Sequence, residues 1–197
     1  MEFEFNSTAT KFGFSSVHDL KKSIANIIKN YVQKGGFLFA MCSATDSYDI
    51  ALSMDSYDGA HKVFDGTSID PKIQSNLDFS KSFAFTDFKI ITDPMIYEFS
   101  DIDVSRYGNI PFPEKENFEL FEFSAKFDPI PTMLTQSHRR IVKGFLGQTT
   151  AFNGKLLKSS VIKLGKVLSE DIYKYIHGRF GKGTFTFYGG HDPEDFS

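Results

Sequence analysis

The sequence is short of cysteine, tryptophan and positive charge, and the first and last of these shortages exclude whole classes of protein. Cys42 is the single cysteine among 197 residues, and tryptophan does not occur. One thiol makes neither an internal disulfide nor a zinc site built from several thiolates. Lys and Arg total 22 against 25 Asp and Glu, a formal charge of −3. This balance argues against a protein that binds nucleic acid or an anionic membrane.

Long apolar runs and clustered metal ligands are missing too. No stretch approaches the ~20 apolar residues that span a bilayer, so we expect no membrane-spanning segment. The acidic start, Met-Glu-Phe-Glu-Phe, does not have the pattern of a secretory signal. His61, His138 and His177 are scattered without metal-ligand spacing, and Asp101 with Asp103 has no partner cluster. We therefore predict no metal and no cofactor.

What the chain has in abundance is phenylalanine, 23 residues within a hydrophobic share of 41%. This composition predicts an aromatic core, and the length fits one domain over 1–197. Apolar residues recur at helical spacing over 17–32, with Ser16 placed to cap the start and Gly35-Gly36 to end the helix. The apolar run 37–41 then predicts a buried parallel strand.

The rest of the chain divides into an irregular middle and a regular end. The region 55–155 carries six of the seven prolines and is interpreted as an insertion or lid. Alternation there predicts strands within 82–91, 118–123 and 141–152. The end predicts three more strands, and the turn before the last of them is Gly181-Lys182-Gly183. These strands are 161–168, 172–177 and 184–188.

Cys42 occupies a position that suits a nucleophile. It follows the strand 37–41 and precedes a helix predicted over 48–54, the layout of a nucleophile elbow. Such a turn aims the positive end of the helix at the reacting oxygen and favours the thiolate. His191, directly after the final strand, stands where a general base would lie, and Glu194 could orient it.

Each of these assignments has a structural alternative. Cys42 is equally interpreted as a buried, structural thiol. The segment around His191 also suits a plain turn, because Asp192 precedes Pro193. Asp46 and Asp49 could bind substrate, but such residues more often cap the following helix.

Several stretches resemble a known family. Residues 35–42 are similar to the elbow of class I glutamine amidotransferase-like domains, and 175–194 resemble their closing strands and His-Pro-Glu end. The finish is also similar to that of trehalose-utilisation-type relatives. Nearly the whole chain resembles a bacterial family that carries the name asparagine synthetase B. That likeness rests on 37–46, 99–103, 131–136 and 183–195.

The resemblance implies an α/β fold with flavodoxin-like layers and a mostly parallel sheet with antiparallel C-terminal strands. It implies a triad of Cys42, His191 and Glu194, with Asp192 as the rival orienter because one residue is inserted before Pro193. The family's Gly-x-Cys-x-Gly has Ala40 and Ala44 here. The synthetase name finds no support in motifs, since residue 2 is Glu and no Ser-Gly-Gly-x-Asp-Ser loop occurs.

The resemblance also implies that the chain is the C-terminal part of a longer protein. Only 41 residues precede Cys42, whereas this fold places several strand–helix units before its elbow. We then expect an unpaired sheet edge, through which the chain could self-associate. The compartment stays open, because a single cysteine fits the cytoplasm and a missing front end could carry an export signal.

Two functions follow from the sequence. The first is a cysteine-dependent hydrolase or amidotransferase-like domain that attacks an amide of a small-molecule substrate through Cys42. The second is a non-catalytic relative that keeps the fold as a binding or assembly module.

Overall fold

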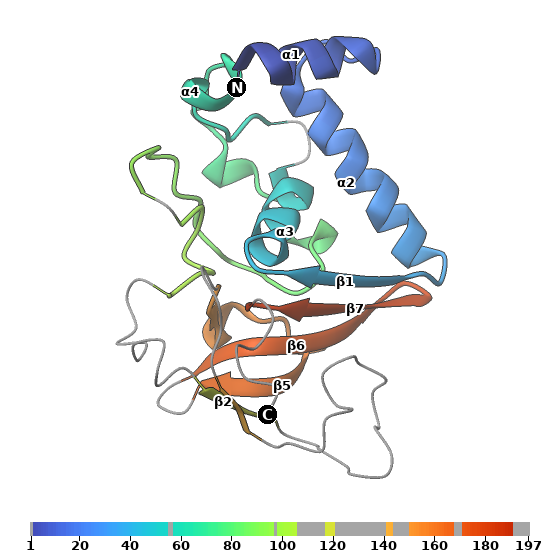
Figure 1. The fold of residues 1–197 in the computed structure, drawn as a ribbon, viewed down its shortest axis with the longest axis vertical. Coiled ribbons are helices and arrows are strands. Elements are labelled where there is room, and N and C mark those ends of the chain that lie inside the picture. The colour runs from blue at the N-terminus through green and yellow to red at the C-terminus, as the bar shows by residue number, and fades with distance from the viewer. Residues whose placement is uncertain are drawn as a thin grey trace.

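The structure is a computed structural model that describes residues 2–54, 57–96, 98–105, 117–120, 141–143, 150–167 and 171–190. It is a mixed α/β fold in which the main helices lie to one side of a twisted sheet (Figure 1). The helices are α1 (Glu2–Lys11), α2 (Val17–Gln33), α3 (Ala44–Met54) and α4 (Lys62–Asp65). Short 3₁₀ turns cover Gln74–Asn76, Phe79–Lys81 and Gly154–Leu156.

The sheet joins strands from both ends of the chain. Its strands are β1 (Phe37–Met41), β2 (Asn117–Leu120), β3 (Ile141–Lys143), β4 (Phe152–Asn153), β5 (Ile162–Val167), β6 (Ile172–Phe180) and β7 (Gly183–Tyr188). Their order is β1-β7-β6-β5-β2-β3, and β4 also pairs with β6. Of the six strand pairs that the structure describes, β1 with β7 is the parallel one, and the other five are antiparallel. The parallel share is thus smaller than the sequence predicts.

Local sequence signals account for α2 and for the hairpin that closes the sheet. The Ser16 hydroxyl accepts the Asp19 N–H at 3.0 Å, which caps α2, and Gly35 at φ 118° follows its last turn. Both ends therefore agree with the prediction. The predicted turn into the last strand is also confirmed, because Phe180 pairs with Gly183 across Gly181-Lys182 and Gly181 has φ 62°.

The core is aromatic, as the composition predicts. Phe83 stacks at 5.3 Å on Phe185 and at 6.4 Å on Phe187, and these rings are almost fully buried. They fill the space between the sheet and the segment that follows the Phe79–Lys81 turn. The large buried side chains of this core include Phe83, Phe85, Phe88, Phe152, Phe185, Phe187 and Ile176.

A buried carboxylate ties α3 to that segment. Asp49 is fully buried and accepts the backbone N–H groups of three successive residues, Phe83 (2.6 Å), Ala84 (2.7 Å) and Phe85 (3.0 Å). Burial raises the pKa of Asp49 to about 6, although these three donors act to lower it. Asp49 is therefore neither a helix cap nor exposed to substrate. Its side chain replaces a strand partner for residues 83–85.

Three local predictions need correction. The segment 82–91 is not a strand but an irregular segment with isolated bridges at Phe85 and Ile90, because its amides bond to Asp49 and to loops. The strand β1 lies at one end of the described strand order with Phe37 45% exposed, so it is not a buried strand. Helix α3 starts at Ala44 rather than Tyr48, which places Asp46 inside its first turn. In addition, residues 2–11, for which the sequence predicts no element because they have no clear period, form α1.

Replacing Asp49 with alanine tests this tie. Asp49→Ala leaves three buried N–H donors without an acceptor, so we expect the free energy of unfolding to fall by about 3 kcal/mol. Urea unfolding followed by circular dichroism measures it. The matched control is Asp93→Ala, because Asp93 accepts a single exposed N–H, from Met95, and should cost less than about 1 kcal/mol. Equal losses in the two variants would contradict the assigned role.

Candidate functional site

The predicted strand–turn–helix around Cys42 is present. Cys42 follows β1, and its N–H donates to the Tyr188 carbonyl at the end of β7 at 2.9 Å. Its own carbonyl accepts the Thr45 N–H at 3.2 Å and the Thr45 hydroxyl at 2.7 Å, which turns the chain into α3. The half-buried cysteine therefore lies between the carboxyl ends of two parallel strands and the N-terminal end of a helix.

The Cys42 backbone is in the left-handed region, with φ 54°. A residue with a Cβ pays a conformational cost there, and such strain is concentrated at functional sites. The two alanines that replace the family's glycines fit this turn. Ala40 is buried within the core, and Ala44 is an exposed first residue of α3. Alanine at these positions is thus compatible with the sharp turn at Cys42.

The chain leaves β7 beside Cys42 through two buried glycines. The Gly189 N–H donates to the Lys174 carbonyl at 2.7 Å, and its carbonyl accepts the Thr150 N–H at 2.6 Å. A Cβ on Gly189 would collide with the Thr150 carbonyl oxygen, so glycine is required there. Gly190 is the last described residue. His191, Asp192 and Glu194 lie outside the described residues, and their proximity to Cys42 stays a prediction.

Two acidic side chains that sequence reasoning did not connect lie near each other at this end of the sheet. Asp46 is 2% exposed in the first turn of α3, and Asp103 is 3% exposed. Asp103 accepts the N–H groups of Ser105 (2.9 Å) and Ala151 (3.1 Å). Ala151 follows Thr150, the residue bonded to Gly189. No local sequence pattern predicts this pair, because 56 residues separate Asp46 from Asp103.

Asp46 differs from Asp49 and Asp103 in the hydrogen bonds that its carboxylate oxygens accept. Within the described ranges, Asp46 Oδ1 has no hydrogen-bond partner. Burial, reinforced by the nearby charge of Asp103, raises the pKa of Asp46 to about 7. Burial likewise raises the pKa of Asp103. A carboxyl group that carries a proton near neutral pH can donate to a bound ligand as well as accept from it.

Two described histidines, His61 and His177, lie elsewhere and act structurally. His61 caps α4 by accepting the Val63 N–H at 3.2 Å. His177 is buried in β6 at 2.9 Å from the Thr186 hydroxyl, and burial lowers its pKa. Across the described part of the chain, no three His, Cys, Asp or Glu side chains are gathered as a metal site would need. His138 lies outside the described residues.

Two further findings concern the chain as a whole. None of the helices that the structure describes is long and apolar enough to cross a membrane. Comparisons of the chain with protein-family models, curated proteins and solved structures found no match. The function must therefore be argued from the geometry around Cys42 and from the sequence.

The buried Asp46 predicts an unusual dependence of stability on pH. An unfolded Asp46 titrates near the ordinary value of 3.8, whereas the folded one titrates near 7. The folded state thus binds the proton more tightly, so this contribution to stability is present at low pH and is lost as the pH rises through 7. We expect the free energy of unfolding, measured in urea between pH 4.5 and 8, to fall less steeply with pH in Asp46→Asn.

The control is Asp93→Asn, an exposed residue whose replacement should leave the slope unchanged. Asp49 and Asp103 have pKa shifts in the same direction, so part of the slope should persist in Asp46→Asn. An Asp46→Asn slope identical to that of the native chain would show that Asp46 does not hold its proton at neutral pH.

Proposed function

We propose that the chain forms a class I glutamine amidotransferase-like domain that hydrolyses an amide through Cys42, His191 and Glu194. The observation that supports this most is the position of Cys42. The cysteine has a left-handed backbone between the end of β1 and the start of α3, and it is hydrogen-bonded to the end of β7. In the sequence, His191 comes only three residues after Tyr188, the residue that receives this bond.

The proposed chemistry combines Cys42 and the start of α3 with His191, whose proximity is a prediction from the sequence. His191 would take the thiol proton, and the Cys42 sulfur would attack the amide carbon to form a tetrahedral intermediate. The backbone N–H after Cys42 and the positive end of α3 would stabilise the oxyanion. His191 then returns the proton to the leaving amine, and water hydrolyses the resulting thioester. Glu194, or Asp192 in its place, would hold the imidazole in the required tautomer.

Asp46 fits this scheme as a group that contacts substrate. It lies four residues after Cys42 and keeps one oxygen without a partner among the described residues. A neutral or ionised carboxyl group can pair with the polar groups of a small amide substrate. This use differs from that of Asp49, whose oxygens are bonded to the backbone of residues 83–85.

A second function, a non-catalytic assembly module, is favoured by the exposed apolar surface around β1. The strand β1 ends the described strand order, and its Phe37 is 45% exposed. On α2, Ile24, Ile27 and Tyr31 are 48%, 64% and 57% exposed. An edge strand beside exposed apolar side chains suits association with another polypeptide, including a second copy. In this role Cys42 would be structural.

The reactivity of Cys42 distinguishes the two functions. If Cys42 is a nucleophile paired with His191, iodoacetamide should alkylate it at pH 7 at least about tenfold faster than glutathione, because the imidazole would accept the thiol proton. We expect His191→Ala to reduce that rate about tenfold. Whichever of Glu194→Gln and Asp192→Asn slows the reaction more identifies the orienter. Because Cys42 is the single cysteine, mass spectrometry of the intact chain measures the rate directly.

The matched control is His61→Ala, which removes a histidine that caps α4 rather than one near Cys42. It should leave the alkylation rate unchanged. A rate equal to that of glutathione, unaffected by His191→Ala, would contradict the catalytic proposal and favour the assembly module.

A further inference from the structure

A cavity of about 350 Å³ lies between the helices, and Cys42 is not among its lining residues. Residues of α1, α2, α3 and α4 form its walls together with the segment 90–99. Helix α3 contributes one face, with residues three and four positions apart. These residues are Ser47, Ile50, Ala51 and Met54. The cavity is therefore distinct from the site at the N-terminal end of α3, and its volume is within the range of small-molecule sites.

The walls of the cavity are mainly apolar. Ile50 and Met54 of α3 line one side, and Ile90 and Ile96 come from the loop segment. Phe64, 47% exposed, adds an aromatic side chain from the small helix α4. An apolar enclosure of this kind favours the burial of a hydrocarbon chain or ring, since burial removes apolar surface from water.

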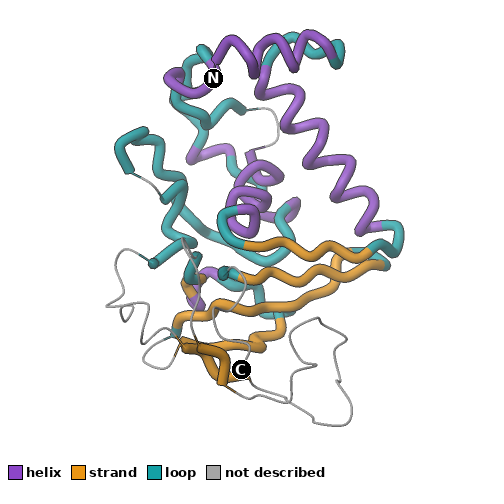
Figure 2. Tube along the Cα trace, viewed as in Figure 1, coloured by secondary structure: helices purple, strands orange, loops and turns teal. Residues whose placement is uncertain are grey.

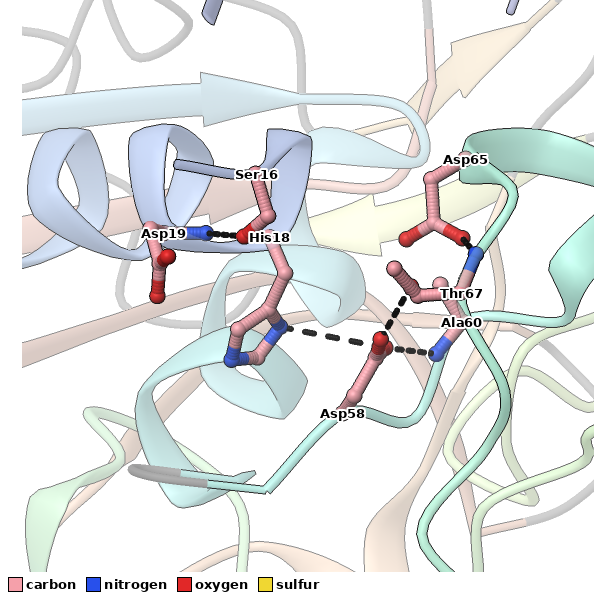
Figure 3. Close-up of polar contacts among 7 residues, drawn as sticks. All are labelled: Ser16, His18, Asp19, Asp58, Ala60, Asp65 and Thr67. Atoms are coloured by element: carbon pink, nitrogen blue, oxygen red, sulfur yellow. Dashed lines mark hydrogen bonds and ion pairs between the residues drawn. The ribbon is translucent and has the colours of Figure 1, made fainter. Parts of the chain in front are cut away.

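The acidic and basic side chains at the cavity differ in how far they are already bonded within the protein. Asp58, just outside the lining, accepts the Ala60 N–H at 3.0 Å and the Thr67 hydroxyl, and lies 3.8 Å from the His18 ring (Figure 3). Asp65 accepts the Thr67 N–H at 3.0 Å, also shown there. Asp93 similarly holds the Met95 N–H. Asp65 and Asp93 each accept a backbone N–H of their own segment, whereas Asp58 also faces His18 on α2.

Lys21, which also lines the cavity, does not organise a loop as these carboxylates do. Its ammonium lies 5.5 Å from the centre of the Phe5 ring and makes no ion pair with any residue that the structure describes. His18 and Lys22 lie beside it on α2 and also line the cavity. The positive end of the 17-residue helix α2 also lies here, although Ser16 caps it and Asp19, outside the lining, adds a negative charge to its first turn. The α2 side of the cavity is therefore suited to an anion.

We propose that this cavity binds a small organic acid, one with a single carboxylate and an apolar chain. The chain would lie against the α3 face and the segment 90–96, and the carboxylate would pair with Lys21 at the start of α2. Lys21 favours an anion over a cation at the α2 side, and Asp65 and Asp93 already accept backbone N–H groups. This site is additional to the proposed amide hydrolysis and does not depend on it.

Calorimetric titration of the full chain with decanoate below its micelle concentration tests the proposal. We expect saturable binding at one site. Decanol and decylamine, controls with the same chain length but without the carboxylate, should bind more weakly. Lys21→Gln should weaken decanoate binding about three- to tenfold, because it removes one partly solvated ion pair. The matched control is Lys29→Gln, on the same helix but outside the lining, which should bind like the native chain.

Filling the cavity supplies a second, independent test. Ala51→Phe places a ring in the cavity from α3 and should reduce decanoate binding at least tenfold. Ala60→Leu fills it from the opposite loop and makes the same test if Ala51→Phe does not fold, as judged by circular dichroism. Folded variants that bind decanoate as the native chain does would overturn the proposal. So would binding to phosphatidylglycerol vesicles without binding to monomeric decanoate, which would assign this face to a membrane surface.

Discussion

The parallel pairing of β1 with β7 is the interaction on which the position of Cys42 depends. It aligns Phe37 with Thr184 and Met41 with Tyr188, and so joins segments almost 150 residues apart in the chain. The same pairing continues in the bond from the Cys42 N–H to Tyr188, after which the chain passes through Gly189. Figure 2 shows the two strands side by side, with the turn into α3 at their end. Without this register, Cys42 would not lie beside the end of β7.

Helix α3 carries two buried carboxyl groups, Asp46 and Asp49, that have different roles. Asp49 is bonded to three backbone N–H groups and fixes the helix against the aromatic core. Asp46, one turn earlier, has an oxygen without a partner among the described residues, and a pKa raised to about 7 by burial. A buried polar atom without a partner destabilises the fold unless a ligand satisfies it. Together with the left-handed backbone of Cys42, this unpartnered oxygen supports the proposal of a site at this end of α3.

The sequence predicted those parts of the fold that local signals determine. The cap at Ser16, the glycine after α2, the turn at Cys42 and the hairpin at Gly181-Lys182 each depend on a few neighbouring residues. Pairings between distant segments were not predictable in the same way. That β1 is an edge strand, that Asp49 replaces a strand partner for 83–85, and that Asp103 lies near Asp46 all depend on tertiary contacts. His191 and Glu194 lie outside the described residues, so their roles rest on sequence alone.

An engineered disulfide tests most directly whether residue 191, which follows β7, lies next to Cys42. His191→Cys adds one thiol to a chain whose native cysteine is Cys42, so a single intramolecular disulfide can form. The control is Lys182→Cys, in the turn at the opposite end of β7, where the Lys182 N–H bonds to the Gln33 carbonyl. Mass spectrometry after mild oxidation should find the 42–191 disulfide in the first variant and no intramolecular disulfide in the second. Failure of His191→Cys to cross-link, or equal cross-linking in both variants, would contradict the proposed site.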